Sequence, residues 1–278
     1  SLRGWGAWND QIRNGIKGEN PKDGHGWIFG TWYGNNSPER IKSYVNGTLT
    51  KDSLGLFQKA AHSVNYLECH DGLTLGDFIR LGLGDVKPDE IITDVDKNAT
   101  LTPTQLKLNK LGALFLFTSR GITMIQSGQE FARSKVTPLT NQNDPNRGMI
   151  DHNTYDKDNE VNYINYNHAK INQDLWDYYQ GLIELRKEFQ SFRRAEYDEV
   201  KFITVKDNDF ALGYEVIHGD EDFVVLFNAH PLKEVVCELP KGKWEVLVNS
   251  DKAGIKTIET VSNIITIQPS TGFVLKRK

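Results

Sequence analysis

The sequence predicts a chain of mixed class, with an α/β region up to residue 195 and an all-β sandwich after it. In the first region, apolar runs of strand length alternate with segments of helical periodicity, a pattern typical of a parallel sheet or barrel. In the second region, only short alternating or apolar runs remain between polar turns, as in a compact antiparallel sandwich. We therefore expect two domains, residues 1–195 and 196–278.

The first βα unit begins with HSVNYLECHD (62–71), an apolar run that reads as a buried strand ending in polar residues. A helix is expected from Thr102, whose side chain can act as the N-cap. Pro103 suits the first helical position and Gln105 completes a capping box. The body of this helix becomes apolar all round, which predicts that it is covered on several sides, and Gly121 marks its end.

The second unit begins with GITMIQSG (121–128), whose continuous apolar run suits a parallel strand buried on both faces. Asn172 is expected to cap a further helix, in which apolar residues recur at helical spacing. The chain thus supplies two βα units, or three if GWGAW (4–8) is the end of an earlier strand. Two or three βα units cannot close an eight-stranded barrel, which takes about 250 residues, so we expect the barrel to be incomplete in this chain.

The sandwich is predicted from eight short runs that turn-forming residues separate. The runs are VKFITVK (200–206), FALGYEVIHG (210–219), DFVVLFNA (222–229), EVVCELP (234–240), KWEVLVNS (243–250), IETV (258–261), IITIQ (264–268) and GFVLK (272–276).

Composition narrows the class of protein. The chain has 278 residues, 38% hydrophobic and 25% charged, as is typical of a globular protein. No uncharged apolar run approaches the ~20 residues that a membrane span needs, and a net charge of -4 without a basic tract argues against a nucleic-acid partner. Cys69 and Cys237 fall in strands of different predicted domains, so neither a disulfide framework nor a thiolate metal site is expected.

The sequence contains little information about cofactors or about the cellular compartment. The seven histidines are scattered without metal-ligand spacing, so no metal or other cofactor is predicted, and nothing indicates calcium. The chain starts at Ser1 without methionine or a signal-peptide pattern, which leaves the compartment open and indicates a piece of a longer gene product.

His70 and Asp71 stand where the first predicted strand ends, the place where βα folds carry catalytic groups. Glu130 follows the next strand in the same way. From spacing alone, Asp71 and Glu130 are the best pair for a retaining glycosidase, which needs two carboxylates about 5–5.5 Å apart. The alternative is structural, because an aspartate at a strand end often caps a turn.

Four stretches, read together and in order, identify a family resemblance. They are VNYLECHDGLTLGDFI (64–79), GITMIQSGQEFARSK (121–135), DHNTYDKDNEVNYINY (151–166) and YYQGLIELRKEFQSFR (178–193). The first is similar to VNYVESHDNxTLWD, the fourth signature region of the alpha-amylase family in type I pullulanases and related debranching enzymes. The others are similar to the segments that follow there, and WNDQIRNGIKG (8–18) resembles FNDRxRDAIRG upstream. The resemblance implies the C-terminal part of a (β/α)8 barrel followed by the family's β-sandwich domain.

The resemblance changes the interpretation of the carboxylates. It implies that the nucleophilic aspartate and the acid/base glutamate lie on barrel strands before the WND segment, outside this sequence. Asp71 then matches the third carboxylate, which stabilises the transition state, and His70 matches the histidine that hydrogen-bonds the same sugar. The pairing of Asp71 with Glu130 is withdrawn, because Glu130 matches a position that is structural.

Further substrate contacts are implied by the same resemblance. Asn153, Tyr155 and Asn162 match a loop that lines the donor side of the cleft, and the 136–150 segment is expected to form the rim. Trp27, Trp32 and Tyr33 have flat faces that can stack on glucose rings, with core packing as the alternative. Gly72 and Gly76 replace an asparagine and a tryptophan of the family pattern, which removes side chains from the expected cleft wall.

The expected protein is a retaining hydrolase of α-1,6 branch points in pullulan, starch or glycogen. This chain alone is expected to be inactive, and either a separate chain supplies the missing N-terminal part of the barrel or the half barrel stays open. Two alternatives remain: isoamylase or glycogen-debranching specificity, and a non-catalytic fragment that binds glucan.

Overall fold

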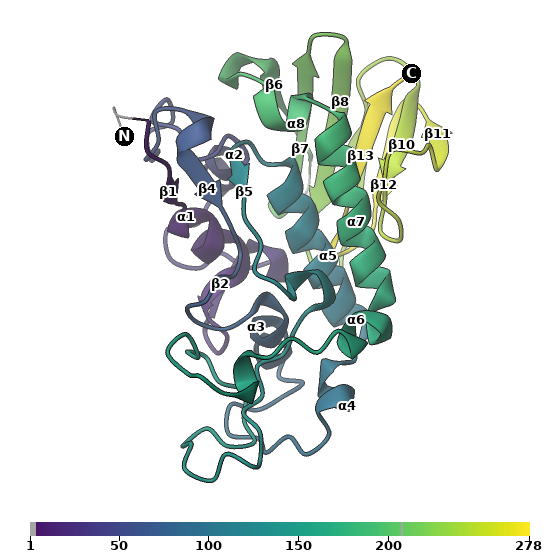
Figure 1. Cartoon of the computed structure of the whole chain (residues 1–278). Helices are drawn as coiled ribbons and strands as arrows, with labels where there is room; N and C mark the ends of the chain where they lie inside the picture. The colour runs from purple at the N-terminus through teal and green to yellow at the C-terminus, as the bar shows by residue number, and fades with distance from the viewer. Residues whose placement is uncertain (1–3, 207) are drawn as a thin grey trace.

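The structure, a computed structural model, describes residues 4–206 and 208–278; Ser1 lies outside this part of the chain. The first half contains a parallel sheet with the strand order β1 (Ala7–Trp8), β4 (Ser63–Asn65) and β5 (Ile122–Thr123) (Figure 1). Of the 4–8 segment, for which the sequence left a strand end open, Ala7–Trp8 form the strand. The sheet is parallel because each return to it passes through helices on the outside.

The two longer predicted strands are much shorter in the structure. Of residues 62–71 only Ser63–Asn65 pair, and of residues 121–128 only Ile122–Thr123. Beyond these positions the backbone is no longer paired with a strand on each side, although Tyr66 and Leu67 remain buried. An apolar run reports burial, whereas a strand also needs neighbours to receive its hydrogen bonds.

The central helix is α5 (Pro103–Thr118), and its start is as predicted: Thr102 and Gln105 form the capping box, with Pro103 at the first helical position. The helix ends before Gly121, which has a φ of 126° that glycine tolerates best. Arg186 of α7 (Gln173–Glu188) donates to the carbonyl oxygens of Phe117 and Ser119, at 2.6 and 3.0 Å, and so satisfies the end of α5.

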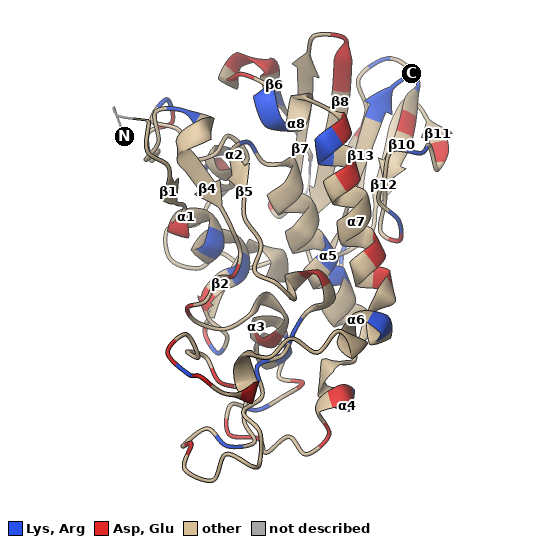
Figure 2. Cartoon of the chain, in the orientation of Figure 1, with Lys and Arg blue, Asp and Glu red and all other residues tan. Residues whose placement is uncertain are grey.

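Helix α7 packs along α5 through one apolar face, and Figure 2 shows acidic residues on its outer side. Asn172 takes the predicted N-cap position of α7, but its side chain makes no capping hydrogen bond. Its amide donates instead to the carbonyl oxygens of Ala99 and Phe131, at 2.9 and 3.0 Å. A buried asparagine that joins three segments gains more from these bonds than from a single cap.

Shorter elements connect these parts. The helices are α1 (Asp10–Ile12), α2 (Pro38–Val45), α3 (Leu75–Gly82), α4 (Val95–Ala99), α6 (Asn167–Ile171) and α8 (Ser191–Arg194). A π-helical turn, η1 (Arg13–Lys17), continues α1, and 3-10 turns are η2 (Trp27–Phe29), η3 (Ala60–His62), η4 (Gln129–Phe131), η5 (Glu160–Asn162) and η6 (Tyr197–Glu199). A small ribbon pairs β2 (Gly18–Asn20) with β3 (Gly24–His25).

The second half is a sandwich, and all eight runs predicted as strands form strands. A six-stranded antiparallel sheet has the order β11-β10-β13-β8-β7-β6, and β9 pairs with β12 against it. The bounds are β6 (Val200–Ile203), β7 (Ala211–His218), β8 (Glu221–Asn228), β9 (Val235–Glu238), β10 (Trp244–Val248), β11 (Glu259–Val261), β12 (Ile264–Ile267) and β13 (Thr271–Arg277).

Strand β8 shows how the sheet joins the two halves. Val225 and Phe227 belong to the large core that contains α5 and α7, whereas Val224 and Leu226 face β9 and β12. Because side chains alternate along a strand, one buried strand serves two apolar layers. The large sheet is thus covered by helices on one face and by the β9–β12 pair on the other.

Candidate active site

The two residues singled out at the end of β4 lie on the surface and close together. His70 Nε2 is 3.4 Å from Asp71 Oδ1, and the side chains are 55% and 53% exposed. Gly72 follows with a φ of 72° in the left-handed region, which turns the chain back toward α3. The pair is therefore accessible to a ligand, and the Asp71 carboxylate does not cap a backbone N–H of the turn.

Asp71 forms part of a cleft of about 1380 Å³. The walls of this Asp71 cleft come from residues 13–22, 71–88 and 146–152. Glu19 is the only other carboxylate among the described residues that line the cleft, and it accepts a 2.8 Å hydrogen bond from the Asn14 amide. The site thus presents one free carboxylate.

Two exposed aromatic rings flank His70. The Trp8 ring lies edge-on to the imidazole, with centroids 5.4 Å apart, and the Tyr155 ring lies at 6.1 Å. Trp8 is 44% exposed and Tyr155 is 57% exposed. Flat apolar faces beside polar groups suit the apolar side of a pyranose ring. Trp8 was not among the predicted site residues, although its place at the end of a parallel strand is where βα folds carry functional groups.

The Trp8 ring is held from beneath. It packs on Tyr66 at 5.4 Å, and the Tyr66 hydroxyl donates to Asp10 while Arg13 donates to that hydroxyl at 3.0 Å. Burial, together with the hydrogen bond to Asp10, raises the pKa of Tyr66. Tyr66 therefore stays neutral and supports the aromatic surface.

The loop that carries Tyr155 is tied by Asn162. The Asn162 amide donates to the carbonyl oxygens of Thr154 and Lys157, at 2.6 and 2.7 Å, and accepts from the Thr154 hydroxyl at 2.7 Å. These bonds tie the side chain to the loop, and a contact of the partly exposed Asn162 with substrate stays a prediction. Asn153 remains exposed beside it, and its backbone N–H donates to Asp151 at 3.1 Å.

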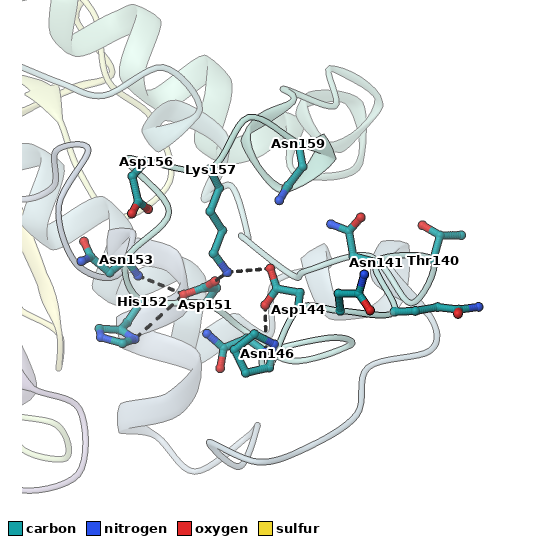
Figure 3. A pocket seen from close by; sticks show the side chains of 13 residues that line it. Thr140, Asn141, Asp144, Asn146, Asp151, His152, Asn153, Asp156, Lys157 and Asn159 are labelled. Carbon is teal, nitrogen blue, oxygen red and sulfur yellow. Dashed lines mark hydrogen bonds and ion pairs between the residues drawn. The ribbon is translucent and has the colours of Figure 1, made fainter.

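An ion pair joins this loop to the 136–150 segment (Figure 3). The Lys157 ammonium is 2.7 Å from Asp144 and also bonds Asp151, which is buried. Burial alone would raise the pKa of Asp151, but hydrogen bonds from Lys157 and the Asn153 N–H hold that pKa below its usual range. A second hollow of about 780 Å³ lies here and shares Asn146 and His152 with the Asp71 cleft, so the 136–150 segment does form a rim.

Comparison with known proteins supports one family. The chain is 24% identical over 259 residues to pullulanase A of Streptococcus pneumoniae and 26% identical over 239 residues to the pullulanase of Bacillus subtilis. These alignments cover 80% and 83% of the chain but only 19% and 29% of the relatives. An isoamylase of Flavobacterium sp is 23% identical over 70% of the chain. The resemblance to pullulanase-type debranching enzymes is confirmed.

Solved pullulanase structures share the fold. The pullulanase from Bacillus acidopullulyticus aligns with a TM-score of 0.75 at 22% identity, and that of Group B Streptococcus with 0.76 at 24%. Each alignment covers 98% of this chain and 30% or 39% of the pullulanase chain. No family model matches the sequence. The chain thus spans well under half the length of the pullulanases that it resembles.

Three tryptophan and tyrosine residues were expected to stack on glucan, and the structure places them differently. Trp27 is only 1% exposed, and its ring packs against Phe115 and Phe227 at 5.5 and 5.9 Å. A sugar cannot reach it, so the binding role expected for Trp27 was wrong. Trp32 stacks on Phe210 at 4.8 Å with one face, and Tyr33 is half-exposed, so for these two the role stays a prediction.

Glu130 was expected to be structural, and Gly76 was expected to leave a gap in the cleft wall. Glu130 accepts a 2.9 Å hydrogen bond from the backbone N–H of Gly128, in agreement with a structural role. Gly76 does not lie in the cleft wall: it is buried in α3, where a Cβ would be 2.7 Å from the Ala132 carbonyl oxygen and 2.8 Å from Arg80 Nη1. The close approach of two backbones excludes the family's tryptophan there.

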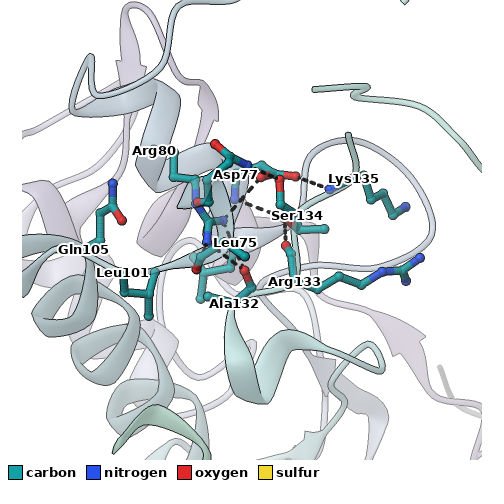
Figure 4. Close-up of polar contacts among 12 residues, drawn as sticks. Leu75, Asp77, Arg80, Leu101, Gln105, Ala132, Arg133, Ser134 and Lys135 are labelled. Carbon is teal, nitrogen blue, oxygen red and sulfur yellow. Dashed lines mark hydrogen bonds and ion pairs between the residues drawn. The ribbon is translucent and has the colours of Figure 1, made fainter. Parts of the chain in front are cut away.

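Arg80 explains this close packing (Figure 4). Its guanidinium donates to the carbonyl oxygens of Ala99 and Ala132, at 2.9 and 3.1 Å, and pairs with Asp77 at 3.3 Å. Asp77 accepts in turn from the Lys135 N–H at 2.7 Å. The network fixes α3, which starts just after the Asp71 turn, to the loop after β5. Within residues 4–206 and 208–278, no cluster of side chains suited to a metal ion is present, and no helix has both the length and the apolar character of a membrane span.

Proposed function

We propose that the chain is part of a retaining glycoside hydrolase that cleaves α-1,6 branch points in pullulan, starch or glycogen. Asp71 is the carboxylate that stabilises the transition state, and His70 hydrogen-bonds the sugar at the cleavage position. The single observation that carries the proposal is the half-exposed His70–Asp71 pair at the edge of the Asp71 cleft, flanked by Trp8. The pullulanase and isoamylase relatives support the reaction class, and pullulanase structures with maltotriose and maltotetraose support an α-glucan ligand.

The chemistry fits a fixed aspartate. A glycosyl transition state carries positive charge on the sugar ring, and a preorganised carboxylate near the hydroxyl groups binds it more tightly than the ground state. The short aspartate side chain on a tied turn places its oxygens with little freedom. His70 adds a donor or acceptor on the same side.

Turnover needs two further carboxylates, which we propose lie on polypeptide outside this chain. Among the described residues, Glu19 is the only carboxylate that lines the cleft besides Asp71, and Glu19 accepts a hydrogen bond from Asn14. The remaining strands would pair with the outer edges of β1 and β5, where the described residues provide no partner strand. Beside β5, a groove of about 470 Å³ includes the exposed Ile122 together with Phe117 and Ile183, an apolar surface that a further βα unit would cover.

The test is a reducing-sugar assay on pullulan. The 278-residue chain alone should give no turnover above the buffer, and addition of a polypeptide with the remaining barrel strands should restore it. In the restored enzyme, Asp71→Asn should lower kcat by about 10²-fold or more, and Asp174→Asn on the outer face of α7 is the matched control. Robust turnover by the isolated chain would contradict the division of the carboxylates.

A non-catalytic glucan-binding fragment is the second candidate, favoured by the exposed rings of Trp8 and Tyr155. Affinity electrophoresis in amylopectin separates the two. If the chain is only a glucan binder, Trp8→Ala should abolish its retardation in the amylopectin gel. Asp71→Asn should then change neither the retardation of the chain alone nor the activity measured after the remaining barrel strands are added. Products from pullulan and from glycogen would then distinguish pullulanase from isoamylase specificity.

A further inference from the structure

The turn that carries Asp71 rests on a buried carboxylate that the proposed reaction does not use. Glu68 is 1% exposed, at the base of the turn, and its Oε2 accepts a short hydrogen bond from the backbone N–H of Leu75. Among the described residues, no hydrogen-bond partner reaches its Oε1. A carboxylate in such a place is costly unless neighbouring charges and donors compensate.

Lys17 holds the same turn from the other side. Its ammonium is buried at the end of η1 and donates to the carbonyl oxygen of Leu73 at 3.3 Å. It also lies 5.4 Å from the centre of the Phe78 ring of α3. Glu68 and Lys17 thus hold the backbone at two positions, Leu75 and Leu73, which lie four and two residues beyond Asp71.

The rest of the turn has few other constraints. The Cys69 thiol donates to the Asp71 carbonyl oxygen at 3.6 Å, and Thr74 donates to the Arg133 carbonyl oxygen at 2.8 Å. The Asp71 carboxylate itself has only the 3.4 Å contact with His70. Its position therefore follows from how the backbone of the turn is held.

The charge on Glu68 is set by its surroundings. Burial raises the pKa of Glu68 to about 7, while the Leu75 N–H and Lys17 oppose that rise. Burial likewise lowers the pKa of Lys17 to about 8, against the attraction of Glu68. The charged or titratable groups around Glu68 are Lys17 of η1, Cys69 on the turn, Asp77 and Arg80 of α3, Arg133 and Lys135 after η4, and Tyr179 of α7.

We propose that Glu68 is the positioning residue for Asp71, and that Glu68 and Lys17 together form a buried clamp on the 69–75 turn. With Glu68 ionised, the carboxylate accepts from the Leu75 N–H and attracts the nearby Lys17 ammonium, which fixes the turn so that Asp71 faces the cleft. With Glu68 protonated, its hydrogen bond from the Leu75 N–H weakens because a neutral acid is a poorer acceptor. The clamp concerns the geometry of the turn; its meaning for glucan binding rests on the function proposed above.

The test is an NMR titration of the ¹⁵N-labelled 278-residue chain from about pH 5.5 to about pH 9, in a His70→Gln background. The background variant removes the imidazole beside Asp71, so that a shift at Asp71 or Gly72 cannot come from His70. The Leu75 amide proton should shift with a midpoint near 7, and the amides of Asp71 and Gly72 should move with the same midpoint. Glu68→Gln should abolish all three titrations, whereas Glu130→Gln, which removes another carboxylate bonded to a backbone N–H, should leave them unchanged.

Two outcomes overturn the clamp. In the first, the chemical shift of the Leu75 amide does not change with pH. In the second, the Leu75 shift changes but those of Asp71 and Gly72 do not, in which case Glu68 is only structural. If Glu68→Gln does not fold, Lys17→Met replaces it: loss of the ammonium should move the Leu75 midpoint upward, and an unchanged midpoint counts against the pair.

A parallel titration with maltotetraose separates the clamp from the proposed function. With the clamp and the function both correct, affinity in the same background should change several-fold with the midpoint seen for Leu75. Absence of binding at every pH by the parent chain, in which His70 is present, overturns the proposed function and leaves the amide shifts to decide the clamp.

Discussion

The rings of Trp8 and His70 meet edge to face, with centroids 5.4 Å apart and an angle of 61° between their planes. Trp8 comes from β1 and His70 from the turn after β4, and the two strands are parallel neighbours. The contact thus joins two strand ends that are distant in sequence into one exposed surface beside Asp71.

Replacement of Trp8 by alanine should weaken α-glucan binding about five- to tenfold, because it removes the stacking face next to His70. Isothermal titration of the chain with maltotetraose measures the change. Trp5→Ala is the matched control, since Trp5 is more exposed and makes no ring contact with His70. Equal effects of the two substitutions would contradict a specific platform at Trp8.

Trp27→Ala should lower the free energy of unfolding by about 3–5 kcal/mol, because it leaves a cavity between Phe115 and Phe227. Urea unfolding followed by circular dichroism provides the measurement. Trp5→Ala should stay within about 0.5 kcal/mol of the parent chain, as expected for an exposed residue. A small loss at Trp27 would mean that the ring is not part of the core.

Lys157→Met should release the 136–150 segment from the loop that carries Tyr155, because Asp144 and the buried Asp151 lose their shared cation. Amide hydrogen exchange in residues 140–157 should accelerate about tenfold or more, while exchange in β8 stays unchanged. Lys170→Met, on α6, serves as the charge control.

Acid should release the same tether. The folded pKa of Asp151 lies below its ordinary value of 3.8, so this carboxylate contributes stability above that pH. The contribution is lost as the pH falls through the lowered pKa. Exchange in residues 140–157 should therefore rise below about pH 3.8 in the parent chain, and the Lys157→Met variant should show a smaller rise.

Glu68→Gln should change how stability depends on pH. The pKa of Glu68 is about 7 in the folded chain, against 4.5 for an ordinary glutamate, so the folded state keeps a proton that the unfolded state has released. Stability should therefore fall as the pH rises from 4.5 to about 7, by an amount on the order of 2 kcal/mol. Glu68→Gln should remove this fall in urea unfolding at about pH 5 and about pH 7.5, and parallel profiles for the variant and the parent chain would disprove it.

The sequence was sufficient to predict the structure of those segments whose conformation depends mainly on neighbouring residues in the chain. The start of α5 was predicted residue by residue, because Thr102 and Gln105 bond each other's backbone within one turn. The eight strands of the sandwich were also predicted, since their alternation and their turns are local. Asn172 takes the predicted N-cap position, but its side-chain amide bonds two distant segments, at Ala99 and Phe131, which the sequence could not indicate.

The sequence by itself determined the start of α5, the strands of the sandwich, the parallel and antiparallel halves, and the place of His70 and Asp71 after a buried run. Only the tertiary structure decided that Trp27 is core and Trp8 is surface, although both are tryptophans next to glycine or polar residues. It likewise decided that Asn162 ties a loop and that Glu68 lies beneath Asp71. Burial and free hydrogen-bonding capacity depend on residues brought in from elsewhere in the chain, and no local pattern records them.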